Sequence, residues 1–242
     1  MKRKKEAAAV TAVAALITTA IATHPVSAAS INYPAGYQTW QCGNTSNRMV
    51  LTFDDKPMDH GSPYTWTDML YWGAYLKNRG IRAMFFVNDK PWVTNELRAM
   101  GHYVGNHTSS NHKRLSQLTP AEVKSEVAGS VDGNMMRPPH GDYDAENKAT
   151  LASLGYRVCT WGISTKDWEG GAGPRNLLST DQIRAKVKAN MNVSGGVILG
   201  HLWTNFPQAL PGIINDVHAA GKLFCRNTGP VTKDVPFPMK CT

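Results

Sequence analysis

Short apolar runs alternate with helix-like segments along the whole chain, and this alternation constrains the fold more than any other feature. Strands are predicted near residues 49–54, 82–88, 102–106, 134–138, 156–162, 196–201 and 222–226. Six helices fit between them, with start signals such as the capping box Thr119–Glu122 and a glycine just after several of their ends. Strands separated by helices pair in parallel, so the sequence predicts an α/β fold with a doubly wound sheet or a closed barrel.

Polar residues at the strand ends favour the barrel. Each of the strands one, three, four, five and six ends in or is followed by a candidate reactive group, namely Asp54 with Asp55, His107, Arg137, Asp167 and His201. In a barrel these ends form one rim, where active sites sit, whereas an open sheet would spread them along an edge. We therefore expect the groups to converge on one site.

The first residues have the pattern of a secretory signal peptide: a basic start at 1–5, a small apolar stretch at 7–22 and a cleavage site at 26–28. A transmembrane anchor fits less well, because the stretch is short and alanine-rich and no stop-transfer pattern follows. We expect a signal peptide at 1–29, an N-terminal extension at 30–47 and one catalytic domain at 48–242. The mature protein is then secreted, extracellular or in the cell wall, without a membrane anchor.

The charge balance excludes one class of partner. The net charge of +8 falls to about +5 without the signal peptide, because residues 2–6 contribute four cations and one anion. This mild excess suits an anionic surface such as a cell wall, or a plain solvated exterior. No Lys/Arg cluster with interleaved aromatic residues indicates nucleic-acid binding. We expect a monomer.

The four cysteines Cys42, Cys159, Cys225 and Cys241 are far apart, so a zinc-thiolate site is not indicated. In an exported protein an even number of cysteines suggests disulfides, and three pairings are possible. Cys42 precedes the first predicted strand and Cys225 lies in the last, so a bridge between them would close the domain. We therefore prefer Cys42–Cys225 with Cys159–Cys241.

The first strand ends in two adjacent carboxylates, Asp54 and Asp55. A buried strand could not carry both charges, so the pair belongs where the strand stops and a pocket opens. Alone, such a pair is more often a surface turn. Two histidines on one later loop, His107 and His112, would complete a set with Asp55 that leaves metal positions open, as catalytic zinc sites require. The sequence thus predicts Asp55, His107 and His112 as metal ligands and Asp54 as the base that takes a proton from water.

Two further groups complete a reaction. Arg137 begins a rigid turn with two prolines and can pair with Asp54, keeping it ionised and oriented, and a backbone N–H in the turn could face an oxyanion. His201 ends an apolar strand, and Asp167 is placed to fix its tautomer for a role as general acid, with Trp168 as a pocket wall. In isolation, a surface arginine and a core histidine are the alternatives. Together the groups predict metal-assisted attack of water on a carbonyl.

Five ordered motifs resemble the polysaccharide deacetylases of carbohydrate esterase family 4, the NodB-homology domain, over residues 48–226. They are Thr52-Phe53-Asp54-Asp55, His107-Thr108, Arg137-Pro138-Pro139-His140-Gly141, Asp167-Trp168 and Leu199-Gly200-His201. The resemblance implies a distorted (β/α) barrel of seven parallel strands. It also implies hydrolysis of acetyl groups from chitin oligomers, peptidoglycan or acetylated xylan. We expect an acetylated polysaccharide or oligosaccharide as the partner, contacted by His140, Trp168 and Leu199.

The same resemblance implies a divalent metal, which we expect to be zinc, with cobalt or manganese as alternatives. It implies Asp54 as base, Asp55 and His107 as metal ligands, and Arg137 as the residue that orients the base. His201, supported by Asp167, would be the acid.

Four positions depart from the family pattern. Asn111 stands where the second histidine usually lies, and His112 follows it, so we favour a one-residue insertion with His112 as ligand and keep Asn111 as the alternative. Lys56 replaces a glycine, His140 replaces an aromatic residue, and Ser164 stands where an acid is common.

Two other functions remain open. Asn111 and Lys56 would suit a catalytically silent carbohydrate-binding relative. Two histidines and one carboxylate also suit iron(II) in an oxygenase, although the barrel order and the His201–Asp167 pair argue against it. The residues do not distinguish N- from O-deacetylation.

Overall fold

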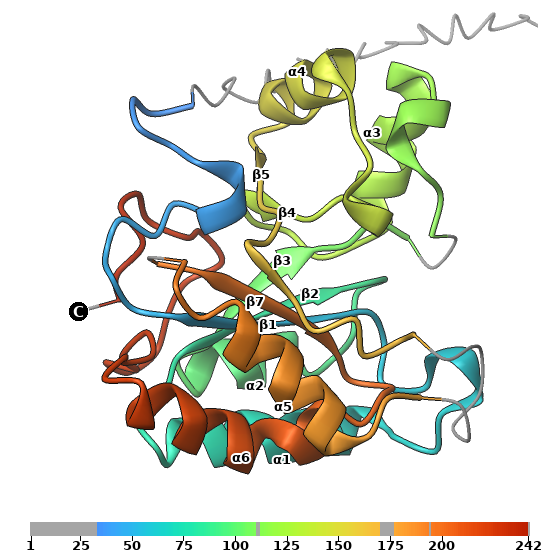
Figure 1. Cartoon of the computed structure of the whole chain (residues 1–242). Helices are drawn as coiled ribbons and strands as arrows, with labels where there is room; N and C mark the ends of the chain where they lie inside the picture. The colour runs from blue at the N-terminus through green and yellow to red at the C-terminus, as the bar shows by residue number, and fades with distance from the viewer. Residues whose placement is uncertain (1–32, 110–111, 170–176, 194, 242) are drawn as a thin grey trace, which may run out of the picture.

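The computed structural model of the chain describes residues 33–109, 112–169, 177–193 and 195–241, so the signal peptide predicted at 1–29 lies outside the described residues. Seven parallel strands form one sheet, curled into a half-barrel, in the order β5-β4-β3-β2-β1-β7-β6 (Figure 1). The strands are β1 (Val50–Asp54), β2 (Ala83–Val87), β3 (Tyr103–Asn106), β4 (Met135–Met136), β5 (Arg157–Val158), β6 (Ile163–Ser164) and β7 (Val197–His201). This confirms the predicted α/β distorted barrel.

Six α-helices accompany the strands in the described part of the chain. They are α1 (Trp66–Lys77), α2 (Thr94–Ala99), α3 (Pro120–Ala128), α4 (Ala145–Ser153), α5 (Thr180–Ala189) and α6 (Phe206–Ala219). In Figure 1, α1, α2, α5 and α6 lie along one side of the sheet, and α3 and α4 lie beside β4 and β5. The helix starts follow the local sequence, because capping boxes form at Thr119 and Ser179 and the Asp144 carboxylate accepts from the Asn147 N–H.

The two edge strands show why the sheet curls. β5 and β6 lie at opposite ends of the strand order, yet only residues 159–162 separate them in the chain. Five residue steps span at most about 17 Å, so the two edges must approach each other. The single strand predicted at 156–162 was therefore wrong, because the chain crosses here from one edge of the sheet to the other.

The strand predicted at 222–226 was wrong as well. In this segment Phe224 forms only an isolated parallel bridge with Met49, and Arg226 forms an isolated antiparallel bridge with Ile81. The segment extends the start of β1 through two backbone hydrogen bonds, from Met49 N to the Leu223 carbonyl and from Cys225 N to the Met49 carbonyl, each 2.8 Å. The sheet still has seven strands, because the strand predicted near 156–162 is replaced by two, β5 and β6.

The preferred disulfide pairing was also wrong: the bridges are Cys42–Cys159 and Cys225–Cys241. Cys42 lies next to the short helix η1 (Thr39–Gln41), and the Thr39 carbonyl accepts from the Thr160 N–H at 2.8 Å. The segment before β1 thus covers the crossing between β5 and β6. The second bridge links the C-terminal segment to Cys225.

The end of β7 depends on a glycine. A Cβ at Gly200 would lie 2.1 Å from the ring of Phe206, the first residue of α6. Glycine therefore lets α6 begin close behind the strand that carries His201. Among the described helices, none combines the length and apolar character needed to cross a bilayer.

Candidate active site

A cavity of about 670 Å³ opens at the carboxyl ends of the strands. It is lined by Asp54, Asp55, His60, His107, His112, Arg114, His140, Trp161, Trp168, Leu199, His201 and Trp203. Eight of the ten predicted site residues are in this lining. The other two, Arg137 and Asp167, are fully buried behind it and touch Asp54 and His201. The structure therefore brings all the predicted groups together.

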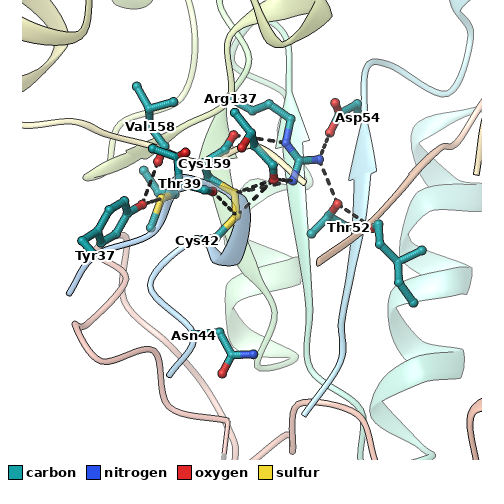
Figure 2. Close-up of a disulfide and its surroundings, with 12 residues drawn as sticks. Tyr37, Thr39, Cys42, Asn44, Thr52, Asp54, Arg137, Val158 and Cys159 are labelled. Atoms are coloured by element: carbon teal, nitrogen blue, oxygen red, sulfur yellow. Dashed lines mark hydrogen bonds and ion pairs between the residues drawn. A yellow bond between two sulfur atoms is a disulfide. The ribbon is translucent and has the colours of Figure 1, made fainter. Parts of the chain in front are cut away.

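Asp54 is held from behind by Arg137. Figure 2 shows the guanidinium between the carboxylate and the chain crossing, with Nη1 2.6 Å from Asp54 Oδ1 and 2.8 Å from Thr52 Oγ1. The far side of the guanidinium donates to the carbonyls of Cys159 and Thr160, at 3.3 and 2.8 Å. Burial lowers the pKa of Arg137, and the Asp54 charge opposes this, as expected for a buried ion pair with its remaining donors satisfied.

Asp55 follows β1 and turns toward the same cavity. Asp55 has φ 73°, a left-handed conformation that is uncommon outside glycine. In an extended strand neighbouring side chains point to opposite faces, and this backbone twist allows Asp54 and Asp55 to reach one cavity. The second Asp55 oxygen accepts from the Trp203 indole N–H at 2.9 Å.

His107 and His112 converge on Asp55. The Nε2 atom of His107 lies 3.2 Å from Asp55 Oδ1, and Nδ1 of His112 lies 3.5 Å from the same oxygen. Among the described residues, these three side chains form a group whose ligand atoms all lie within 4.8 Å of one another. One carboxylate and two imidazoles are a donor set that divalent zinc accepts.

The hydrogen bonding of His107 shows that the group fits a cation. The Nδ1 atom of His107 lies 2.7 Å from the carbonyl oxygen of Arg137 and must carry a proton to bond there. In the neutral ring Nε2 then presents a lone pair to Asp55 Oδ1, so two acceptors face each other. A positive charge between them, either a proton on Nε2 or a metal ion, would satisfy both acceptors. A carbonyl behind a ligating histidine is the usual arrangement in metal sites.

The charges around Asp55 change its acidity. Burial favours the neutral carboxyl, but hydrogen bonding to His107 and the charges of His201, His107 and His112 outweigh it and lower the pKa of Asp55 well below its usual range. His112 has a raised pKa, chiefly because its ring bonds to Asp59. The site therefore holds Asp55 as an anion, the form in which it can bind a metal.

His201 is oriented by Asp167. Its Nδ1 lies 3.0 Å from Asp167 Oδ1, and its backbone N–H donates to the other oxygen at 2.7 Å. The Thr204 hydroxyl also donates to Asp167. Burial lowers the pKa of His201, but Asp167, Asp55 and Asp54 outweigh it and raise the value to about 9. Nε2 then faces the cavity, 3.8 Å from Asp55 Oδ2, with a proton to give.

Sequence reasoning missed several residues of the site. Trp203 supports Asp55, and His60 packs on its ring with the centroids 4.2 Å apart. Trp161 forms another wall, at the crossing between the sheet edges. The position of Trp203, two residues after His201 and just past the strand end, is a signal that could have found it. Asn111, the alternative ligand, lies outside the described residues.

Comparisons with known proteins agree with this geometry. Residues 43–159 match a family model described as polysaccharide deacetylase. The chain is 30% identical over 187 residues to the chitin deacetylase of Colletotrichum lindemuthianum, covering 69% of this chain and 71% of the relative. It is 31% identical over 168 residues to the chitooligosaccharide deacetylase of a Bradyrhizobium species, covering 63% and 69%. The solved structure of the C. lindemuthianum chitin deacetylase matches with a TM-score of 0.62 and 25% identity, covering 79% of this chain and 90% of that one.

Proposed function

The chain belongs to the polysaccharide deacetylases of carbohydrate esterase family 4, and we propose that it is a metal-dependent enzyme that removes N-acetyl groups from polymers of N-acetylglucosamine. The observation that carries the proposal is the meeting of three groups on one cavity: Asp54 with Arg137, Asp55 with two histidines, and His201 with Asp167. The similarity to deacetylases of chitin and chitooligosaccharide supports this substrate class.

The proposed metal ligands are Asp55, His107 and His112, and we favour zinc over cobalt or manganese. A divalent ion bound there would lower the pKa of a bound water and polarise the acetyl carbonyl. His107 offers Nε2, because its Nδ1 is bonded to the Arg137 carbonyl. Asp55 is kept in place for this task by the Trp203 indole.

Asp54 would accept the proton of the attacking water. Arg137 binds one of its oxygens, which leaves Oδ2 as the oxygen that faces the ligand histidine, 3.8 Å from His107 Nε2. Proton transfer requires a fixed direction as well as a suitable base, and the guanidinium supplies that direction. Arg137 is therefore a positioning residue.

His201 would protonate the leaving nitrogen of the sugar. Asp167 holds the ring by Nδ1, so the Nε2 proton is the one delivered into the cavity. With a pKa of about 9 the imidazole carries this proton at neutral pH. A bound cation would reduce the influence of Asp55 and bring the pKa of His201 closer to neutrality.

The turn after β4 would stabilise the oxyanion. Pro138 and Pro139 have no N–H, and the Gly141 N–H donates to the Pro138 carbonyl at 2.9 Å. The His140 N–H is therefore the donor that this turn can offer. Nearby, buried Leu199 would contact the acetyl methyl, and Trp168, 36% exposed, would contact the sugar ring.

An acetate-release panel tests the proposal. Chitin oligomers, peptidoglycan and acetylxylan are incubated with the protein in the presence of zinc, cobalt or a chelator. We expect release from the two N-acetylated substrates, loss of activity with chelator, and loss in Asp54→Asn. Release from acetylxylan alone would assign the enzyme to ester substrates. No release from any substrate by metal-loaded protein would support the silent carbohydrate-binding relative.

We further propose that the enzyme acts outside the cell, with residues 1–29 as signal peptide and 48–242 as catalytic domain. Two disulfides support an oxidising compartment. Mass spectrometry of the exported protein should find a mature N-terminus close to residue 29. Retention of the first 29 residues would contradict it.

A further inference from the structure

A charged cluster beside the cavity is not used by the chemistry above. It consists of Lys56, Asp59 and Asp89, and it lies against His112. We propose that Asp59 is a positioning residue that fixes the ring orientation and tautomer of His112 and thereby sets the affinity for the metal. This inference rests on the metal site proposed above. Lys56, which departs from the family pattern, is part of the same arrangement.

The two ring nitrogens of His112 face two different carboxylates. Nδ1 lies 3.5 Å from Asp55 Oδ1, and Nε2 lies 3.4 Å from Asp59 Oδ2. A proton on Nε2 satisfies Asp59 and leaves the Nδ1 lone pair directed at Asp55, where the metal would bind. His107 presents the opposite nitrogen, because its Nδ1 is bonded to a carbonyl. The two ligands would thus bind through different ring atoms, each fixed by a partner behind it.

Asp59 is itself held in place. It begins the short helix η2 (Asp59–Gly61), and its Oδ2 accepts from the backbone N–H of Lys56 at 3.1 Å. The Lys56 ammonium lies 4.0 Å from Asp59 Oδ1 and 3.2 Å from Asp89 Oδ2. Its side chain is only 18% exposed, and Lys56 is not among the residues that line the cavity. Lys56 and Asp89 therefore keep the carboxylate aligned with His112.

This arrangement suits the displaced position of His112. The histidine stands five residues after His107, one more than the family pattern has, and its backbone is left-handed with φ 47°. A ligand on such a segment needs an external hold to keep one orientation. The loop after β1 carries both Asp55 and Asp59, so one segment supplies a ligand and also orients the other ligand.

Zinc affinity of the whole mature protein tests the role. Zinc is titrated against a chromophoric chelator in the wild type, Asp59→Asn, Asp59→Glu and the matched control Asp181→Asn. We expect a 10- to 100-fold loss of affinity in Asp59→Asn, as for other partners of ligating histidines, and partial recovery in Asp59→Glu. Asp181 is 86% exposed, pairs with Arg184 and does not belong to the charged cluster, so the affinity of Asp181→Asn should stay within about threefold.

The outcomes separate this inference from the proposed function. If the wild type binds zinc and Asp59→Asn binds it equally well, the role of Asp59 is wrong and the metal site stands. If the wild type itself binds no zinc, both are wrong. A second measurement needs no variant at Asp59: nitrogen-15 NMR of the metal-free protein, with His112 assigned by His112→Gln. At a pH where the ring is neutral, the spectrum should show its single proton on Nε2, and a neutral ring with the proton on Nδ1 would overturn the inference.

Discussion

At the scale of single residues, two neighbouring carboxylates have different partners, and this difference suits the separate tasks proposed for them. Asp54 meets a guanidinium, whereas Asp55 meets two imidazoles and an indole. The left-handed backbone at Asp55 is what allows both side chains to share one cavity. An extended Asp55 would place its carboxylate on the other face of the strand.

Arg137→Lys should show that the arginine acts through Asp54. Lysine keeps the charge but loses the planar fork that bonds Asp54, Thr52 and two carbonyls at once. We expect kcat to fall by about 10- to 100-fold, with KM nearly unchanged, because a misdirected base affects the chemical step. In an Asp54→Asn background the Arg137→Lys change should lower kcat little further. Full additivity of the two losses would contradict a shared role.

Asp167→Asn should shift the pH profile. The proposed acid, His201, can act only while it is protonated, and Asp167 is the strongest of the groups that raise its pKa. Removing that charge lowers the pKa of His201, so the basic limb of kcat should move to lower pH. At pH 8 we expect a loss on the order of 100-fold. The matched control is Lys166→Ala, whose side chain is 49% exposed and pairs with Glu169. An unshifted basic limb in Asp167→Asn would rule out the proposed pair.

At the scale of elements, the disulfide Cys42–Cys159 supports the site from behind. Figure 2 places it beside the Arg137 guanidinium, whose Nη2 lies 3.5 Å from Cys159 Sγ. The same crossing between β5 and β6 provides the carbonyls that hold the arginine. The other bridge, Cys225–Cys241, lies outside these contacts.

Removing each disulfide separately should distinguish its effect on stability from its effect on activity. The bridges close loops with sequence separations of 117 and 16 residues, which correspond to about 5 and about 3 kcal/mol of stabilisation in the chain-entropy account. We expect both double serine variants to melt earlier, and Cys42→Ser with Cys159→Ser to melt earliest. Only that variant should also lose kcat, measured below its melting point. Equal kcat in both would mean that the bridge does not support Arg137.

The elements also show what the sequence can predict. Helix α3 was predicted from the capping box Thr119–Glu122, which acts within four residues, and the structure confirms it; α5 begins with a capping box of the same kind at Ser179. Strands β4, β5 and β6 have two residues each, shorter than the runs predicted at 134–138 and 156–162. That length and the disulfide pairing depend on contacts between distant segments. A local pattern does not contain them.

In the site, too, some features could be predicted from the sequence and others depend on contacts between distant segments. Its main groups were predictable because each stands at the end of a strand, and parallel strands bring these ends together. The position of Trp203 just past a strand end indicated that it lies near the site, but its bond to Asp55 and the contact of Asp59 with His112 were not predictable, because they depend on the path of loops. Trp203 reaches Asp55 across 148 positions of sequence.

At the scale of the whole molecule, a buried histidine joins the helical layer to the sheet. The His102 ring accepts from the Ala83 N–H of β2 at 3.1 Å and donates from Nε2 to the Gly73 carbonyl of α1 at 2.8 Å. Both nitrogens are used only when the ring is neutral. Burial, with the charges of Arg82 and Lys77, lowers the pKa of His102 from 6.5 to about 4, against the opposing bond to Gly73.

Folding stability should therefore fall in mild acid. The folded protein resists protonation of His102 while the unfolded chain accepts it, so the contribution is complete above pH 6.5 and is lost as the pH falls through about 4. The shift corresponds to about 3 kcal/mol. Other groups titrate in the same range, so the measured quantity is the difference in unfolding free energy between the wild type and His102→Gln, with disulfides intact. Glutamine can replace both hydrogen bonds but does not titrate, so this difference should shrink by about 3 kcal/mol between pH 7.5 and pH 4. If the stability curves of the wild type and His102→Gln run parallel between these pH values, His102 takes up protons equally in the folded and unfolded states. Another group would then cause the acid sensitivity.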